Sequence, residues 1–183
     1  MTPNRDVSAR FGPLTAVLFV SIILGGWQSH AMSQTPQVEQ QRLETQALMV
    51  RTRQGKQFFF TVELADDPEE QRIGLMNRAE LDPDAGMIFV HDEPRILGMW
   101  MKNTLIALDM LFIDAGGRIL NIHENAIPGD LTSIRSRGPA SAVLEIAGGR
   151  AAQLELSVGD QLFHCHFDNF PCKITAPQSN SGS

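Results

Sequence analysis

The sequence predicts a mainly β (α+β) fold: a small β-barrel or sandwich-like domain with one or two short helices. Three observations support this prediction. Most apolar runs in the 183-residue chain are short and rich in β-branched and aromatic residues. Turn residues (Gly, Pro, Asp and Asn) separate these runs at close spacing. Only one segment carries a strong helix start, so helices are expected to be few and short.

The first elements follow from local signals. Residues 48–50 and 58–64 are apolar runs around Gly55, which predicts a β-hairpin. A helix is then expected to begin after Asp67, because Pro68 suits the first helical position and Glu70 completes a capping box. We expect this helix to continue to about residue 76.

The remaining elements are mostly short strands joined by tight turns. A hairpin is expected from 96–103 and 108–113, which would bring Lys102 and Asp109 near its closed end. Gly116-Gly117 predicts a turn into the next strand. The other expected strands are 87–90, 118–123, 143–146 and 161–167, with a short helix within 147–156.

The N-terminus has the three parts of a secretory signal. Arg5 and Arg10 give a positive start, residues 14–24 are apolar, and Ser29 to Ala31 offer small residues for cleavage. We therefore expect residues 1–31 to be a signal peptide and the protein to be exported, periplasmic or extracellular. An uncleaved anchor is the alternative, although the apolar run is about half the roughly 20 residues that span a bilayer. No stable membrane insertion is expected after cleavage.

The rest of the chain divides by composition. Residues 32–46 are polar and Gln-rich, which is typical of a flexible linker. Residues 47–175 are expected to form a single globular domain. Residues 176–183 (APQSNSGS) are expected to be a disordered tail.

Charge excludes some partners. The net charge is −6, and loss of residues 1–31 would make the chain more acidic still. An acidic chain without a basic run argues against nucleic acid as a partner. The two cysteines, Cys165 and Cys172, are close in sequence, and in an exported chain they are expected to form a disulfide.

A polar cluster beside Trp100 is the leading candidate site. Lys102 and Asn103 follow Trp100 directly, and Asp109 lies a short distance further on. One interpretation is structural: Lys102 pairs with Asp109 while Asn103 caps a turn. The other is a ligand-binding site with Trp100 as its floor and Arg72 near it.

The run from Val62 to Asp160 resembles domain-of-unknown-function family 192 (DUF192). The matching pieces, in order, are Arg72 to Met76, Gly86 to Phe89, Met99 to Thr104, Leu108-Asp109, Phe112 to Asp114, Pro139-Ala140, Val143 to Glu145 and Gly159-Asp160. The resemblance implies a small, mainly β fold that is often exported, and it implies no established reaction. The family usually has Pro in place of Ala107 and a different loop at 127–138.

Two sets of residues suggest metal binding. Met99 and Met101 would share a strand face, and thioethers suit Cu(I). His164 and His166 flank Cys165 in the last expected strand and, with Cys172, offer ligands for a metal ion. The structural alternatives are core methionines and surface histidines, and no cofactor is expected.

The sequence supports three functional hypotheses. The first is an exported cell-envelope module that binds a small ligand or an envelope protein. The second is a hydrolytic enzyme that uses Asp109 with a second carboxylate, for which Asp114, Glu124 and Glu145 are candidates. The third is periplasmic binding of copper or zinc. Whether the protein is an enzyme stays open at this point.

Overall fold

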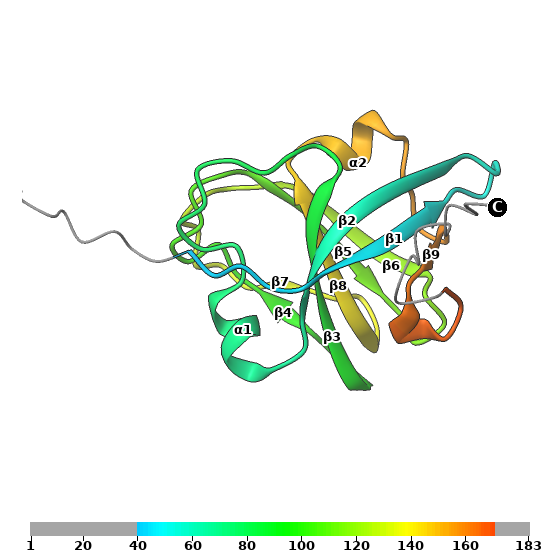
Figure 1. Ribbon diagram of the computed structural model, residues 1–183, viewed down its shortest axis with the longest axis horizontal. Helices are drawn as coiled ribbons and strands as arrows, with labels where there is room; N and C mark the ends of the chain where they lie inside the picture. Colours follow the sequence, from blue (N-terminus) through cyan, green and yellow to red (C-terminus); the bar gives the residue numbers. More distant parts are fainter. Residues whose placement is uncertain (1–39, 171–183) are drawn as a thin grey trace, which may run out of the picture. The chain divides into compact units, whose positions relative to one another are not determined.

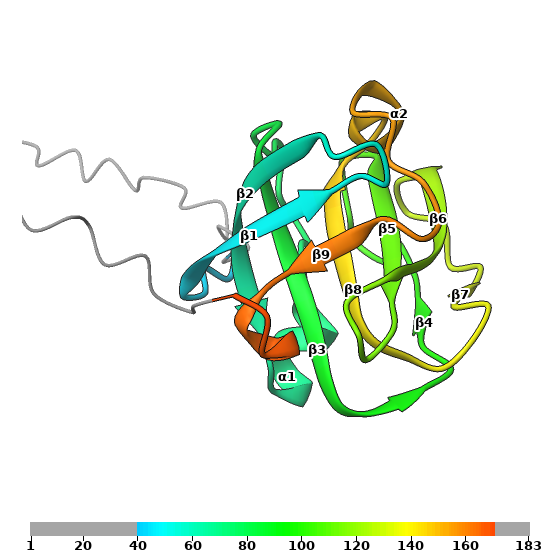
Figure 2. The ribbon, with the colours of Figure 1, turned by 90° about the vertical axis from the view of Figure 1, so that its right-hand side faces the viewer.

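A computed structural model describes residues 40–170. Seven strands form one curled sheet in the order β6-β5-β8-β3-β2-β1-β9, and β4 and β7 form a separate two-stranded sheet. The curl brings β1 and β9 across β3 and β8, so the large sheet resembles half of a barrel (Figure 1, Figure 2). The expected mainly β domain with short helices is confirmed.

The first hairpin forms as predicted. Strand β1 (Thr45–Arg51) pairs with β2 (Gln57–Ala65) in antiparallel register around Gly55, whose φ of 86° suits glycine. Helix α1 (Pro68–Ile73) begins at the expected capping box, because Asp67 accepts the N–H groups of Glu69 and Glu70. The helix ends three residues earlier than expected, at Gly74 with a φ of 50°.

Helix α1 belongs to the crossover between two parallel strands. Strand β3 (Ala85–Arg95) pairs with β2 in parallel and with β8 in antiparallel register. A parallel pair needs a long connection, and residues 66–84 supply it. Strand β2 ends at Ala65, so the second half of β3 continues beyond it along α1.

The central strands are buried on both faces. Strand β5 (Leu108–Ile113) pairs with β6 (Ile119–Ala126) and with β8 (Ala140–Ala147). All residues of β5, and all but the last of β8, are buried, which explains their almost continuous apolar sequences. The short strands β4 (Gly98–Met99) and β7 (Ile134–Arg135) cover one side of the sheet.

The end of the described chain closes the curl. After helix α2 (Arg150–Gln153), strand β9 (Gln161–Phe163) pairs with β1, and a 3₁₀ turn, η1 (Cys165–Phe167), follows. Arg118, just before β6, bridges to Gln161. The Ile119 N–H also donates to Asp160 O at 3.0 Å, so the two edges of the large sheet meet.

Two apolar clusters occupy the two faces of the sheet. The inner cluster fills the curl and includes Leu48, Ile88 and Leu144. The outer cluster lies under α1 and β4 and includes Met87, Met110 and Val143. Alternate residues of β8 therefore point to different cores.

Two expectations are wrong in detail. Segment 96–103 does not form a hairpin with β5: only Gly98–Met99 is a strand, and it pairs with β7. Both edges of β5 are taken, one by β6 and the other by β8, which leaves no edge for 96–103. The last strand also ends at Phe163, so His164 and His166 do not share a strand face.

Residues 40–46 are part of the folded domain and not only a linker. Strand β1 begins at Thr45, and the Leu43 N–H donates to Glu63 at 2.8 Å. Arg78 binds both oxygens of Glu63, at 2.6 and 2.7 Å, and also donates to Gln41 O. Burial raises the pKa of Glu63, but the bonds from Arg78 and Leu43 outweigh it and bring that pKa below its ordinary value.

The expected signal peptide at 1–31 and the expected tail at 176–183 lie outside the described residues. No helix within residues 40–170 is long and apolar enough to cross a membrane.

Candidate functional site

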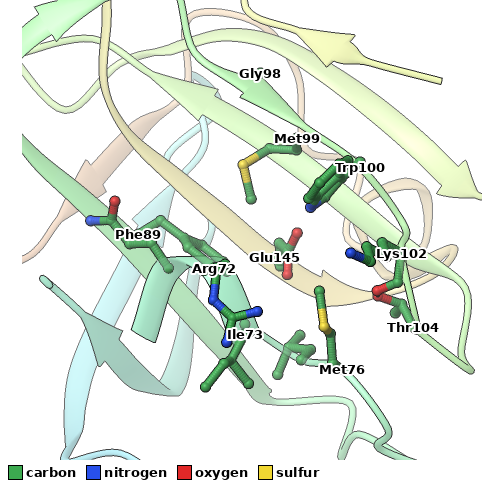
Figure 3. A pocket seen from close by; sticks show the side chains of 13 residues that line it. Arg72, Ile73, Met76, Phe89, Gly98, Met99, Trp100, Lys102, Thr104 and Glu145 are labelled. Carbon is green, nitrogen blue, oxygen red and sulfur yellow. The ribbon is translucent and has the colours of Figure 1, made fainter. Parts of the chain in front are cut away.

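A small pocket opens between helix α1 and strand β4, above the middle of β8 (Figure 3). Its volume of about 80 Å³ corresponds to roughly three water molecules at their share of about 30 Å³ each in the liquid. The pocket has apolar walls with a few polar groups. The lining residues that carry the argument below are Arg72, Met76, Phe89, Trp100, Lys102 and Glu145. We call it the Glu145 pocket.

Glu145 provides the floor of this pocket. It lies on β8 directly between Met87 of β3 and Met110 of β5, both of which are fully buried. Only 4% of Glu145 is exposed, and no residue in the range 40–170 donates a hydrogen bond or forms an ion pair with its carboxyl. Burial raises the pKa of Glu145 to about 8. The carboxyl points into the space between Arg72, Trp100 and Lys102 (Figure 3).

Lys102 and Trp100 form the outer rim. The Lys102 Nζ lies 5.4 Å from the centre of the Trp100 ring, which is a cation–π contact. No carboxylate of residues 40–170 lies within ion-pair distance of Lys102. The Trp100 side chain is half-exposed and offers a flat apolar surface beside the cation. The rim can therefore bind an anionic group that carries some apolar surface.

Helix α1 forms the opposite wall. Arg72 reaches toward the pocket, but its Nε donates to Glu69 Oε2 at 2.7 Å and its Nη2 donates to Glu69 Oε1. Glu69 thus balances part of the positive charge of Arg72 on the helix surface. At the end of α1, Gly74 lies so close to Phe89 that an added Cβ would meet the ring at 3.2 Å. This close approach sets the narrow width of the pocket.

Asp109 lies on the other face of the sheet. It is opposite Ile146 in the β5–β8 register, so it points toward the inner core, whereas Glu145 points outward. Its carboxylate accepts the N–H groups of Asn125, Gly149 and Ala151 at 2.8, 2.9 and 2.7 Å. The expected contact with Lys102 is absent among the described ion pairs, because the hairpin that would create it does not form.

Asn103 holds the two walls together and does not line the pocket. It has a φ of 54°, and its carbonyl accepts the N–H of Asn77 at 2.8 Å. Its Nδ2 lies 3.9 Å from the sulfur of Met76. Of the five predicted site residues, Arg72, Trp100 and Lys102 line one pocket, while Asn103 and Asp109 lie outside it.

The candidate metal ligands do not converge. Met99 lines the Glu145 pocket, but Met101 is fully buried in the outer core. His164 is buried, and its Nδ1 accepts the His166 N–H at 3.3 Å. No group of three or more His, Cys, Asp or Glu side chains within residues 40–170 is arranged to hold a metal ion.

The disulfide stays a prediction, because Cys172 lies outside the described residues. Cys165 begins η1 next to the strand that closes the sheet.

Glu145 is the residue whose importance the sequence understates. It appears there in the Val143 to Glu145 family match and as one of three possible partners for Asp109. The available signal is a single carboxylate inside an otherwise apolar strand, Ala140–Ala147. Carboxylates are seldom buried without a partner, so such a residue is a reasonable site candidate.

These features define a class: a small, curled β domain with one unpaired buried carboxyl at the base of a pocket. The family model DUF192, described as an uncharacterized ACR, matches residues 49–164, and the chain belongs to this family. The resemblance inferred from the sequence is therefore confirmed. No curated protein matches the chain.

Two solved structures are similar to this chain. One, from Sinorhizobium meliloti 1021, is described as a suspected transcription regulator; it is 43% identical, with a TM-score of 0.66, over 68% of this chain and 96% of that chain. The other is a protein of unknown function from Novosphingobium aromaticivorans DSM 12444. It is 42% identical, with a TM-score of 0.64, over 66% of this chain and 85% of that chain.

Proposed function

We infer that this protein is an exported binding module, and that its Glu145 pocket holds a small organic acid or the end of a larger one. The observation that supports this is the unpaired Glu145 carboxyl, buried and aimed into a cavity. Leaving a polar group buried without a partner costs about 1–3 kcal/mol, so a ligand that supplies the partner gains from it.

The chemistry of the ligand follows from the two unpaired groups. Lys102 attracts an anion, and Trp100 gives contact area next to it. Glu145 accepts a hydrogen bond from an amine or hydroxyl group. A carboxylate with a neighbouring amino or hydroxyl group satisfies both ends within a space of about 80 Å³.

Export of the module rests on the signal-like sequence of residues 1–31. The regulator description of the S. meliloti protein is not extended to this chain, whose net charge of −6 is unfavourable for nucleic acid.

The other hypotheses have less support from the geometry. A hydrolase that uses two carboxylates needs both in one cleft, but Glu145 is the single carboxylate among the described lining residues. Asp109 is engaged by three backbone N–H groups on the far face. Copper or zinc binding lacks a converging set of ligands within residues 40–170.

Calorimetric titration with glycine, L-alanine, L-serine and L-lactate tests the proposal. We expect at least one of these acids to bind, and Lys102→Ala and Glu145→Met each to weaken it about tenfold or more, since each removes one polar contact. Lys56→Ala and Glu155→Gln are matched controls, because Lys56 and Glu155 pair on the surface elsewhere. The proposal fails if neither these acids nor larger molecules that end in such an acid bind, or if the pocket variants bind as well as the controls.

A further inference from the structure

The pocket continues into a longer cleft along helix α1. Gln71, Phe89, Gly98 and Met99 line both the Glu145 pocket and a neighbouring hollow of about 320 Å³. Gln71, His91 and Arg95 line both that hollow and a third one of about 460 Å³. We call this continuous space the α1 cleft. It is much longer than a single small acid requires.

One side of the α1 cleft is a free strand edge. The Ser136 N–H donates to Leu97 O at 3.0 Å, so Leu97 and Ser136 form a hydrogen-bonded pair of the β4–β7 ladder. In antiparallel strands such pairs alternate with non-hydrogen-bonded ones. Gly98 and Trp100 therefore turn their N–H and C=O groups away from β7. No backbone or side-chain group in the range 40–170 satisfies them.

These backbone groups lie beside the Glu145 pocket. Gly98 and Trp100 both line the pocket, and they are two residues apart, which is the spacing at which an added strand forms its hydrogen bonds. The side-chain atoms of Gln71 do not occupy this edge, because its Nε2 donates to Ala65 O and Val90 O at 3.3 and 2.8 Å. An extended peptide, whose backbone N–H and C=O groups alternate along each side, fits this edge.

The positive charge of Lys102 favours the C-terminal end of such a peptide at this place. Lys102 lies just beyond the free edge and has no acidic partner within residues 40–170. A peptide that ends at this point would place its terminal carboxylate against Lys102 and its last side chain in the Glu145 pocket. A volume of about 80 Å³ admits only a small side chain. At the far end of the cleft three carboxylates outnumber the one arginine, Arg95, and this excess of negative charge favours basic residues upstream in the peptide. The three carboxylates are Asp66, Asp92 and Glu93.

We propose that the α1 cleft binds the C-terminal end of an extended peptide, which adds as a strand to the Gly98–Trp100 edge and places its carboxylate at Lys102. The terminal residue is small and carries a hydroxyl (Ser or Thr), which donates a hydrogen bond to Glu145. The inference rests on the proposed function, since it assigns a ligand class to the same pocket.

The test begins with a synthetic mixture of octapeptides that are random except for a C-terminal Ser or Thr. The purified full chain is immobilised, retained peptides are sequenced by mass spectrometry, and one is resynthesised. We expect its C-terminal amide to bind at least tenfold more weakly. We also expect Lys102→Ala to weaken the free acid by a similar factor but not to weaken the amide further.

Alternate backbone N-methylation of the same peptide tests strand addition. Two peptides are compared, one methylated at the odd-numbered backbone amides and the other at the even-numbered ones. One pattern should abolish binding and the other should leave the affinity within about threefold, because only alternate N–H groups face the strand edge. Equal effects of the two patterns, an amide that binds like the acid, or no retained peptide would each overturn the proposal. If the small acids bind at Lys102 and Glu145 while peptides do not, only this inference fails; if neither binds, the proposed function fails with it.

Discussion

At the scale of single residues, two carboxylates on neighbouring strands have opposite roles. Asp109 is fully buried, and three backbone N–H groups surround its oxygens, so it joins β5 to β6 and to the start of α2. Glu145 is equally buried but has no partner in the described part of the chain. The first arrangement stabilises the fold, whereas the second leaves a group available to a ligand.

Replacing Asp109 should therefore affect stability. Asp109→Asn puts an NH₂ group against at least one backbone N–H, and we expect a loss of about 2–4 kcal/mol in the free energy of unfolding. Chemical denaturation measures it.

Asp114→Asn is the matched control for this variant. Asp114 Oδ1 accepts the N–H groups of Gly116 and Arg118 in an exposed turn, and an amide oxygen can replace it. We expect a loss below about 1 kcal/mol there. If Asp109→Asn were no more destabilising than Asp114→Asn, the anchoring role of Asp109 would be wrong.

At the scale of elements, local signals predicted what local interactions determine. The β1–β2 hairpin and the start of α1 depend on turn and capping residues within a few positions of one another, and both were predicted correctly. The hairpin of 96–103 with β5 was wrong, because strand pairing across the sheet depends on distant segments such as β8. A single sequence contains no local signal for that choice.

The same limit applies to the site. Their residue types suggest one site for Arg72, Trp100 and Lys102, and these three residues do line one pocket. Glu145 reaches that pocket only because β8 lies between β3 and β5. The prediction that Asp109 belongs to the site depends on a hairpin that does not form, so this error also arises from strand pairing between distant segments.

Because α1 forms one wall of the cleft, its cap should influence the site. Asp67→Ala removes the acceptor for Glu69 and Glu70 N–H, and we expect a loss of about 1 kcal/mol in stability. Hydrogen exchange should become faster at residues 68–76 and stay unchanged in β5 and β8. Glu69→Ala is the control: it removes the exposed pair with Arg72 but keeps the cap, so we expect little change in stability. Equal exchange in both variants would contradict a separate role for the cap.

At the scale of the whole molecule, buried groups of opposite kinds set the pH dependence of stability. His164 is buried, and burial, with a further contribution from His166, lowers its pKa to about 4. Burial also lowers the pKa of His91 and His166. A histidine with a lowered pKa stabilises the fold above its unfolded value near 6.5, and this contribution is lost as the pH falls toward 4.

Glu145 acts in the opposite direction. Its pKa is near 8 in the folded protein and 4.5 in the reference state, so the folded protein holds a proton that the unfolded chain releases. Stability therefore decreases as the pH rises from 4.5 to 8, by an upper limit of about 5 kcal/mol. Between pH 4.5 and 6.5 the opposite slopes of His164 and Glu145 largely cancel. The lowered pKa values of His91 and His166 then place the maximum of stability close to pH 6.5, and Glu145 causes the decrease above it.

Two variants should separate these contributions in denaturation curves measured from pH 4 to pH 9. Glu145→Gln removes the decrease in stability above pH 6.5. We therefore expect the free energy of unfolding of this variant to exceed that of the wild type by about 2–5 kcal/mol at pH 8, and to stay nearly constant from pH 6.5 upward. His164→Asn keeps an acceptor for the His166 N–H and should weaken the loss on the acid side while the decrease toward pH 8 persists. A Glu145→Gln curve that still falls between pH 6.5 and 8 would show that another group titrates there. Such a result would also remove the energetic argument for the pocket, because an unpaired carboxyl that does not destabilise the free protein has little to gain from a ligand.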